Sequence, residues 1–412
     1  MEVVNIKRNS NEKMLDVLLY GILISAFSLQ NKTILNFTVI KIGGIWLNFF
    51  DAIIIFCIVT LFFRFAYIQR RGFTKVDWVL IGLFLFFFLM GVARQNELGN
   101  IFYNARAFFY LITMYWITKN FRGNATFFYK VLGLCSFLCS SIYFYTFFTN
   151  SRIIDGEFTR FVTFNFQIVL LYMSFSIYLL KSSNLSVSNT INIFYGALAI
   201  FTTQTRTLMI PAAFTILVLI CYGMLSQRSN IKLRLSLGIL LSILCYFLLF
   251  TKINELIFER FTNFDSADQS TLDLRIDSIV YNYSTMNVFE KLWGGGFGRE
   301  ISYFSTFSNY LSDTYSLELY LGEYIVKYGI IGTLILNMLF LAVILKNRRF
   351  ITKGFLLTLF VGIISLSISG LSGYTGQFFL GIVLGLLSNN FIWSKYKNIS
   401  NVQLHETGYL IK

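Results

Sequence analysis

The sequence has few of the residues that hold metal ions or build disulfide frameworks. Its one histidine, His405, lies near the C-terminus, and its five cysteines lie inside apolar runs, without a Cys-x-x-Cys pair or a cysteine–histidine spacing. Zinc sites and disulfide frameworks are recognised by such spacings. The sequence therefore predicts no metal site, no disulfide framework and no cofactor.

Charge and proline are also scarce. Charged residues make up 13% of the chain, whereas soluble domains carry about 25%. Pro211 is the single proline, 56% of residues are hydrophobic, and the mean hydropathy is +0.65. This composition is typical of a membrane protein with many spans. The first apolar run, which follows the N-terminal "MEVVNIKRNSNEK", has no small-residue cleavage site, which predicts a membrane helix and not a removed signal peptide.

Long apolar runs occur along most of the chain. A spanning helix needs about 20 mostly apolar residues, and the sequence predicts an all-α fold of about twelve transmembrane helices at 14–30, 45–64, 77–93, 101–118, 126–148, 161–180, 190–205, 207–226, 233–251, 317–345, 354–371 and 374–393. Arg206 alone separates the seventh run from the eighth, so these two form a tight hairpin or one broken pair.

The basic residues give the orientation. An even number of spans puts both termini on one side, and assigning that side to the cytoplasm puts 21 of the 34 lysines and arginines in cytoplasmic segments. The strongest markers are "RFAYIQRRGFTK" at 64–75 and "KNRRFITK" at 346–353. This bias follows the positive-inside rule. Much of the net charge of +14 is thus a signal of topology, and it does not require nucleic acid as a partner.

The acids cluster differently. Eleven of the 20 lie between 252 and 326, in a predicted external loop at 252–316 and the start of the helix after it. The chain therefore divides into helices one to nine at 1–251, the periplasmic loop at 252–316, and the last three helices with a cytoplasmic tail at 317–412. Apolar residues at helical spacing predict two short amphipathic helices in the loop, at 253–264 and 272–293, and "WGGGFGRE" predicts a turn after them.

Four arginines of the external side are candidate anion contacts: Arg206, Arg260, Arg275 and Arg299. A guanidinium buried in hydrocarbon needs a partner or water, and it binds phosphate through two parallel hydrogen bonds. Three of them also have a simpler interpretation. Arg206 could cap a hairpin, with its side chain reaching the headgroups, and Arg260 and Arg275 could be surface charges on amphipathic helices. The backbone N–H groups of Gly295 and Gly296 are candidates for a phosphate cradle, or the glycines only form a turn.

Three acids at the start of the tenth span are candidate bases: Asp313, Glu318 and Glu323. Asp313 precedes the apolar run, as a helix N-cap would. Glu318 and Glu323 are harder to explain by local structure, since they fall within a helix made mostly of Leu, Tyr and Ile. Lys327 is placed to neutralise Glu323 at the i,i+4 spacing.

This pattern resembles a known family. Many helices with one long external loop, "TRT" at 205–207, Arg275, "GGGFGR" at 294–299 and "DTYSLELYLGEYIVKYGIIG" at 313–332 are similar to the bacterial O-antigen polymerases (Wzy) and, more distantly, the O-antigen ligases. Ligases of this class carry a histidine near the position of Asp313. This departure favours a polymerase over a ligase.

The resemblance implies a glycosyltransferase of the bacterial inner membrane, with both termini cytoplasmic, that acts in lipopolysaccharide or other surface-polysaccharide biosynthesis. It transfers a growing glycan from undecaprenyl pyrophosphate to a sugar hydroxyl of another lipid-linked repeat unit. Arg206, Arg275 and Arg299, with Arg260, Gly295 and Gly296, would contact the pyrophosphate. Asp313, then Glu318 and Glu323, would activate the acceptor hydroxyl. The expected partners are lipid-linked oligosaccharide, membrane lipid and a regulator of chain length.

Two alternatives stay open. A ligase performs nearly the same reaction but attaches the glycan to a different acceptor. A flippase for lipid-linked oligosaccharides belongs to another class, and transporters tend to show internal repeats and polar sites near the middle of the membrane. The external position predicted for most polar residues of this chain argues against a flippase.

Overall fold

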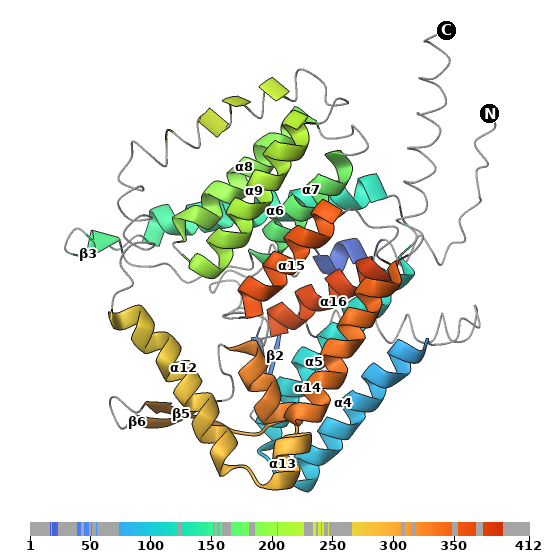
Figure 1. Ribbon diagram of the computed structural model, residues 1–412, viewed down its shortest axis with the longest axis vertical. Coiled ribbons are helices and arrows are strands. Elements are labelled where there is room, and N and C mark those ends of the chain that lie inside the picture. The colour runs from blue at the N-terminus through green and yellow to red at the C-terminus, as the bar shows by residue number, and fades with distance from the viewer. Residues whose placement is uncertain are drawn as a thin grey trace.

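The computed structural model describes most of the helical part of the chain (Figure 1). The described residues are 17, 19–23, 39–42, 45–48, 51, 55, 74–121, 123, 125–150, 153–154, 157–158, 166–180, 186–203, 205–225, 234–235, 238–239, 241–242, 246, 266–305, 310–314, 319–347, 353–367 and 374–389. Glu318, Arg260, the first predicted amphipathic helix and most of the predicted span at 233–251 lie outside them.

Helices dominate the described residues and fall where the hydropathy predicts them. The structure has helices α4 (Lys75–Ala93), α5 (Leu98–Asn120), α6 (Ala125–Asn150), α7 (Gln167–Leu180), α8 (Val187–Thr202), α9 (Arg206–Leu225), α14 (Tyr320–Asn347), α15 (Lys353–Ser367) and α16 (Tyr374–Ser388). Nine predicted runs are thereby confirmed as helices. Helix α8 ends at Thr202, α9 begins at Arg206, and the two helices pack against each other, which favours the tight hairpin over one broken pair.

Three described helices are long and apolar enough to cross a membrane: Lys75–Ala93, Phe127–Phe148 and Tyr320–Lys346. Shorter apolar helices occur at Gln167–Ile177, Val187–Thr202, Arg206–Tyr222, Phe355–Leu366 and Gly376–Ser388. Both sets carry large exposed apolar side chains, such as Leu89, Phe137 and Leu217. Such surfaces indicate a membrane protein, because lipid and not water is the solvent that suits them.

The all-α prediction misses three short antiparallel hairpins. Strands β1 (Val39–Ile42) and β2 (Ile45–Asn48) pair with each other, as do β3 (Ile153–Ile154) and β4 (Glu157–Phe158), and β5 (Ile301–Ser305) and β6 (Tyr310–Thr314). The span predicted at 45–64 is therefore wrong at its start, since 45–48 are strand. The β-branched and aromatic residues in these strands suit a pleated backbone as well as a helix.

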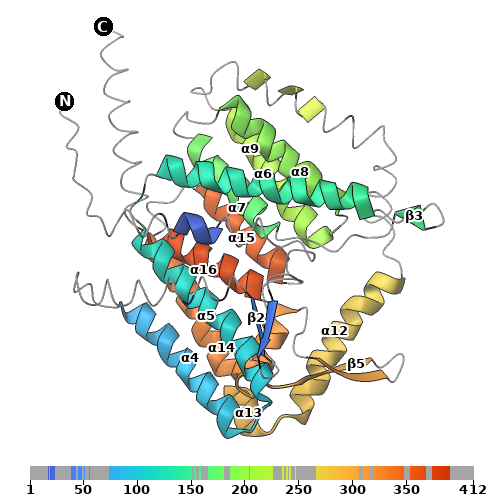
Figure 2. The ribbon, with the colours of Figure 1, turned by 180° about the vertical axis from the view of Figure 1, so that it is seen from behind.

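The helices form two groups (Figures 1 and 2). In the upper half of Figure 1, α7 packs against α6, α9 and α15, while α8 packs against α6 and α9. In the lower half, α5 packs closely along α16 and also against α4, and α14 packs against α16. The α5–α16 pair is tight because Gly385 faces the α5 backbone: a Cβ there would lie 2.7 Å from the Tyr115 carbonyl oxygen.

The C-terminal part of the predicted loop contains two further helices at the lower end of the molecule. They are α12 (Ser266–Thr285) and α13 (Val288–Trp293), which replace the single amphipathic helix expected over 272–293. Asn287 begins α13, because its side chain accepts a hydrogen bond from the Glu290 backbone N–H (2.9 Å). Both helices pack against α14.

The turn after α13 enters the helix bundle. Phe297 is fully buried, and its ring lies among those of Phe84 (5.7 Å between centroids), Phe108 (5.8 Å) and Tyr328 (6.0 Å). The predicted turn at "WGGGFGRE" is confirmed, and Gly294, Gly296 and Gly298 adopt φ of 79°, 77° and 80°. Phe297 thus anchors the loop between α4, α5 and α14.

Helix α14 bends at Gly329, where φ is 69° and ψ is 177°. A bend interrupts the ladder of i to i−4 hydrogen bonds and leaves carbonyl groups before it without helical donors. The glycine turn supplies donors instead: the N–H of Gly295 donates to the Val326 carbonyl (3.0 Å) and that of Gly296 to the Lys327 carbonyl (2.9 Å). The glycine turn therefore supplies the hydrogen-bond donors that the bend of α14 leaves missing.

Candidate anion site at the lower end of the bundle

Glu290 is held in place by the helix that carries it. Its carboxylate Oε2 accepts a hydrogen bond from the backbone N–H of Asn287 (3.1 Å), while its own N–H donates to the Asn287 side chain. This reciprocal pair is a capping box. The side chain is only 8% exposed, so the carboxylate has a fixed position and little access to solvent.

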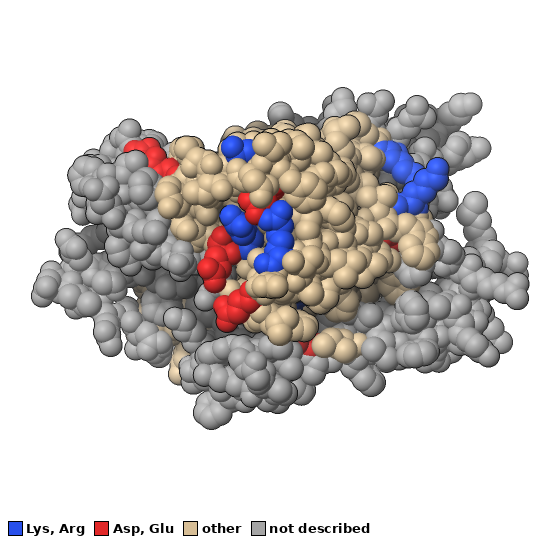
Figure 3. Space-filling view, turned by 90° about the horizontal axis from the view of Figure 1, so that it is seen from below, with Lys and Arg blue, Asp and Glu red and all other residues tan. Residues whose placement is uncertain are grey.

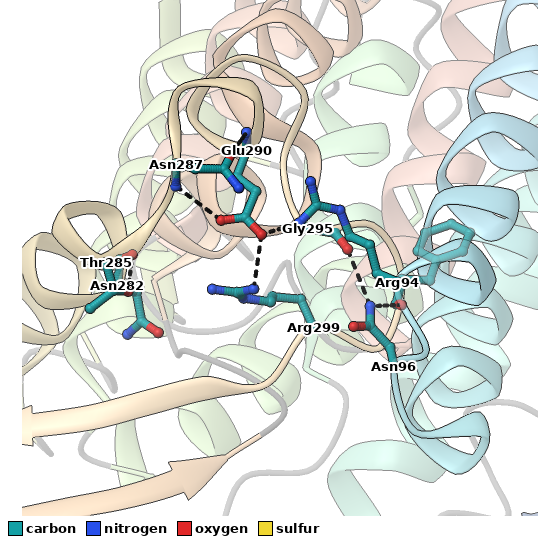
Figure 4. Close-up of polar contacts among 9 residues, drawn as sticks. Arg94, Asn96, Asn282, Thr285, Asn287, Glu290, Gly295 and Arg299 are labelled. Atoms are coloured by element: carbon teal, nitrogen blue, oxygen red, sulfur yellow. Dashed lines mark hydrogen bonds and ion pairs between the residues drawn. The ribbon is translucent and has the colours of Figure 1, made fainter.

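Two arginines from distant parts of the chain meet this carboxylate (Figure 4). Arg94 follows the last residue of α4, and Arg299 follows the glycine turn. Both donate to the same oxygen, Glu290 Oε1, through an Nη1 atom; the Arg299 distance is 3.2 Å. We call these three residues the arginine–glutamate cluster. Two guanidinium groups on one carboxylate leave an excess of one positive charge.

Asn96 ties the two sides of the cluster together. Its side-chain amide donates to the carbonyl oxygens of Gly295 (3.1 Å) and Phe297 (2.8 Å). The N–H of Phe297 donates in turn to the Phe87 carbonyl of α4 (3.1 Å). The end of α4 and the turn that precedes Arg299 are therefore one hydrogen-bonded unit, and this unit fixes the spacing of the two arginines.

The cluster lies at a partly accessible surface. The side chains of Arg94 and Arg299 are 24% and 28% exposed. Figure 3 views the molecule from this end and shows basic and acidic side chains gathered together on a described surface that is otherwise mostly tan. Guanidinium groups bind carboxylate and phosphate oxygens in the same planar geometry. The cluster is therefore a candidate site for an anion that would compete with Glu290.

Replacing Glu290 with glutamine should destabilise the protein. The substitution keeps the shape and the cap but leaves Arg94 and Arg299 facing each other without a counter-charge. We expect a loss of about 1–3 kcal/mol, measured as a lower melting temperature of the purified protein in detergent. Added inorganic pyrophosphate should raise the melting temperature of Glu290→Gln more than that of the wild type. An equal rise in both proteins would contradict an anion site at this cluster.

The predicted arginines are only partly brought together. Arg299 lies in the cluster, and Arg275 lies on α12, which packs against α14 and β5. Arg206 begins α9, which packs against α7, α8 and α15 in the upper half of Figure 1. Arg206 and Arg299 therefore belong to different groups of helices and loops, and a single clamp formed by both stays a prediction. Arg260 lies outside the described residues.

The glycine turn argues against a phosphate cradle at Gly295 and Gly296. Their N–H groups donate to the carbonyl oxygens of Val326 and Lys327, so they point into the bundle. A cradle would need the same N–H groups for the anion. The arrangement favours the simpler interpretation, in which the glycines form a turn that positions Arg299.

The three predicted acids have different positions. Glu323 is 3% exposed and forms an ion pair with Lys327, also 3% exposed, which confirms the predicted i,i+4 pair. Asp313 is not the N-cap of the tenth span: it lies on β6 opposite Ser302, and α14 begins seven residues later, at Tyr320. The reason is that 310–314 pairs with 301–305 as a hairpin before the helix starts. Glu318 lies outside the described residues.

Sequence reasoning missed Arg94, Asn96 and Glu290 as site residues. The pattern Asn-x-x-Glu at 287–290 is a capping-box signature and was available as a signal for a fixed carboxylate. Arg94 gives no such signal, because a basic residue after an apolar helix is common at membrane interfaces. Nothing local connects Arg94 to a carboxylate that lies 196 residues further along the chain.

No protein-family model, curated protein or solved structure matches this chain. The functional proposal therefore rests on the sequence pattern. The geometry of the arginine–glutamate cluster, the buried Glu323–Lys327 pair and the apolar helices supports it.

Proposed function

We propose that the chain is a membrane glycosyltransferase that polymerises lipid-linked repeat units of a bacterial surface polysaccharide. The donor is a glycan on undecaprenyl pyrophosphate, and the acceptor is a sugar hydroxyl of another lipid-linked unit. The proposal rests on the family resemblance of the sequence. The observation that supports it best is the arginine–glutamate cluster, with its excess positive charge at the end of a membrane-length helix.

The position of the cluster suits a lipid pyrophosphate. Arg94 follows α4, a helix long and apolar enough to cross a membrane, so an anion at Arg94 would lie near the level of the lipid headgroups. The predicted alternation of spans would put 94 and 299 on one side of the membrane, and the start of α4 with the end of α5 on the other. Asp77, near the start of α4, forms an ion pair with Lys119, near the end of α5 (2.6 Å), which fits this alternation.

The reaction needs charge stabilisation and a base. The acceptor oxygen attacks the anomeric carbon of the donor sugar, the bond from that carbon to the pyrophosphate oxygen breaks, and the electron pair leaves with the lipid pyrophosphate. Arg94 and Arg299 would stabilise the charge that develops there, displacing Glu290 from one guanidinium. The hydroxyl proton passes to a carboxylate. Glu323 is the candidate base whose side chain the structure describes; Asp313 and Glu318 stay predictions.

Reconstitution tests the function directly. Purified protein in vesicles should convert lipid-pyrophosphate-linked repeat units into a ladder of longer glycans and release undecaprenyl pyrophosphate. The substitutions Arg206→Ala and Arg275→Ala should abolish the ladder if these arginines also contact the donor, while both variants stay in the membrane at wild-type levels. Gel electrophoresis of the glycan and a phosphate assay give the two readouts.

The products separate the alternatives. Normal ladders from both arginine variants would remove Arg206 and Arg275 from the donor site. Absence of any ladder with the wild type, together with transfer of a finished glycan to a non-lipid-linked acceptor, would identify a ligase. Movement of the intact lipid-linked unit across the vesicle membrane without bond cleavage would identify a flippase.

A further inference from the structure

A second group of polar side chains lies within the lower helices, away from the arginine–glutamate cluster. Asn104, on α5, is 4% exposed, and neither Nδ2 nor Oδ1 has a hydrogen-bond partner among the described residues. Asn100, one turn earlier, differs because its amide donates to Glu97 (2.8 Å). An amide carries two donors and one acceptor oxygen, and Asn104 leaves all of them unused.

Two tyrosines of α14 are also buried polar side chains. Tyr320 and Tyr324 are 4% and 2% exposed, and their ring centroids are 4.0 Å apart. Their hydroxyl groups adjoin each other, but neither oxygen makes a hydrogen bond of normal geometry in the part of the chain described. Gln377 of α16, itself 2% exposed, lies beside Tyr324. Buried polar groups almost always have partners, so water or a bound ligand is the expected partner of these atoms.

The helix packing brings these groups to one level. Helices α5 and α16 run in the same direction, because Gly381 faces Leu111 and Gly385, one turn later, faces Tyr115. Gln377 is one turn before Gly381, which places it beside the turn of α5 that contains Asn104. Because Gln377 also adjoins the second tyrosine of α14, the two tyrosines lie at the same level of the bundle.

The group adjoins the buried ion pair. Glu323 is the residue before Tyr324 and is three residues after Tyr320, so its Cα lies on the same turn of α14. Its ion-pair partner is Lys327, one turn further along the same helix. A ligand held by Asn104, Tyr320 and Tyr324 would therefore lie close to a buried carboxylate that is paired with a lysine.

We infer that Asn104, Tyr320 and Tyr324 form a subsite for a neutral sugar ring. The inference rests on the proposed function and names the part of the acceptor that this region binds. A sugar offers several hydroxyls that both donate and accept, which matches one amide and two phenolic hydroxyls, and its C–H faces suit aromatic rings. The nearby Glu323 carboxylate would receive the proton of the bound hydroxyl.

Binding of free sugars tests the subsite without requiring polymerisation. The full-length protein, in a detergent without a sugar headgroup, is heated with glucose, galactose, N-acetylglucosamine or N-acetylgalactosamine. At least one sugar should raise the melting temperature of the wild type. Asn104→Leu and Tyr324→Phe should weaken the apparent sugar affinity at least tenfold. Without sugar, Asn104→Leu should melt at the wild-type temperature or higher, since it loses a buried amide that has no partner among the described residues. Tyr324→Phe should melt at or slightly below the wild-type temperature, because its hydroxyl adjoins Tyr320 and Gln377.

Tyr129→Phe is the matched control. Its hydroxyl has a partner, Ser176 (2.8 Å), so this variant should melt at a lower temperature and keep its response to sugar. The inference is overturned if no sugar raises the melting temperature of the wild type, or if both subsite variants still respond to sugar as the wild type does. It is also overturned if Asn104→Leu lowers the melting temperature in the absence of sugar. A lost response without any polymer from the wild type supports the subsite and counts against the polymerase. Normal elongation by both subsite variants supports the polymerase and counts against the subsite.

Discussion

Under the proposed function, replacing Arg94 or Arg299 with alanine should lower the rate of glycan elongation by about 10²–10³-fold, the usual effect of losing one donor to a developing negative charge. The double variant should lose at least as much, because groups that act as a unit are not additive. The double variant also leaves the buried Glu290 carboxylate without either arginine. The informative protein therefore combines Arg94→Ala and Arg299→Ala with Glu290→Gln. Initial rates of undecaprenyl pyrophosphate release measure the effect.

Two controls make this prediction specific. Lys119→Ala removes a positive charge at the other end of α5, where it pairs with Asp77, and it should leave elongation unchanged. Arg299→Lys keeps the charge but loses the planar pair of donors, so its rate should lie between the wild type and Arg299→Ala. Elongation at the wild-type rate by the triple variant would show that the cluster has only a structural role.

Gly296→Ala should unfold the junction between the glycine turn and the bundle. The residue adopts φ of 77°, and a Cβ there would lie 2.6 Å from the Gly91 backbone nitrogen. The left-handed conformation alone costs about 1–2 kcal/mol for a residue with a side chain, and the contact with backbone adds to it. The melting temperature should fall sharply and elongation should be lost, because the turn sets the position of Arg299.

Gly82→Ala is the control for this substitution. Gly82 lies within α4, and a Cβ there would meet nothing within 4 Å. Alanine is favoured over glycine inside a helix by about 1 kcal/mol, so this variant should be as stable as the wild type or more so. If Gly296→Ala keeps both the melting temperature and the activity of the wild type, the turn does not support the site as described.

The helices were largely predictable from the sequence, because a spanning helix is encoded by local hydropathy. The ends of α4 and α9 agree with the predicted runs to within a few residues. The predictions fail where a pairing with another segment decides the structure. Residues 45–48 and Asp313 both lie in hairpins, and the apolar and polar pattern around them does not distinguish a short strand from the end of a helix.

The site was less predictable for a related reason. The i,i+4 spacing revealed the Glu323–Lys327 pair, since both residues lie on one helix. Arg299 was recognised as a candidate, but its neighbours were not: Arg94 reaches Glu290 only because Phe297 is buried among the aromatic rings of α4 and α5. No local pattern encodes that packing. By contrast, a local signal did exist for the division of the predicted helix at 272–293 into α12 and α13. That signal is the capping box of Asn287 and Glu290, which starts a new helix.

The bend of α14 at Gly329 has a consequence for biogenesis. The Val326 and Lys327 carbonyls receive their donors from the turn at 294–298, and Phe87 of α4 holds that turn in place. Unsatisfied carbonyl groups are costly in hydrocarbon. The first half of α14 alone would therefore leave these two carbonyl groups unsatisfied in lipid. We expect it to reach its final position only after the turn at 294–298 has packed against α4.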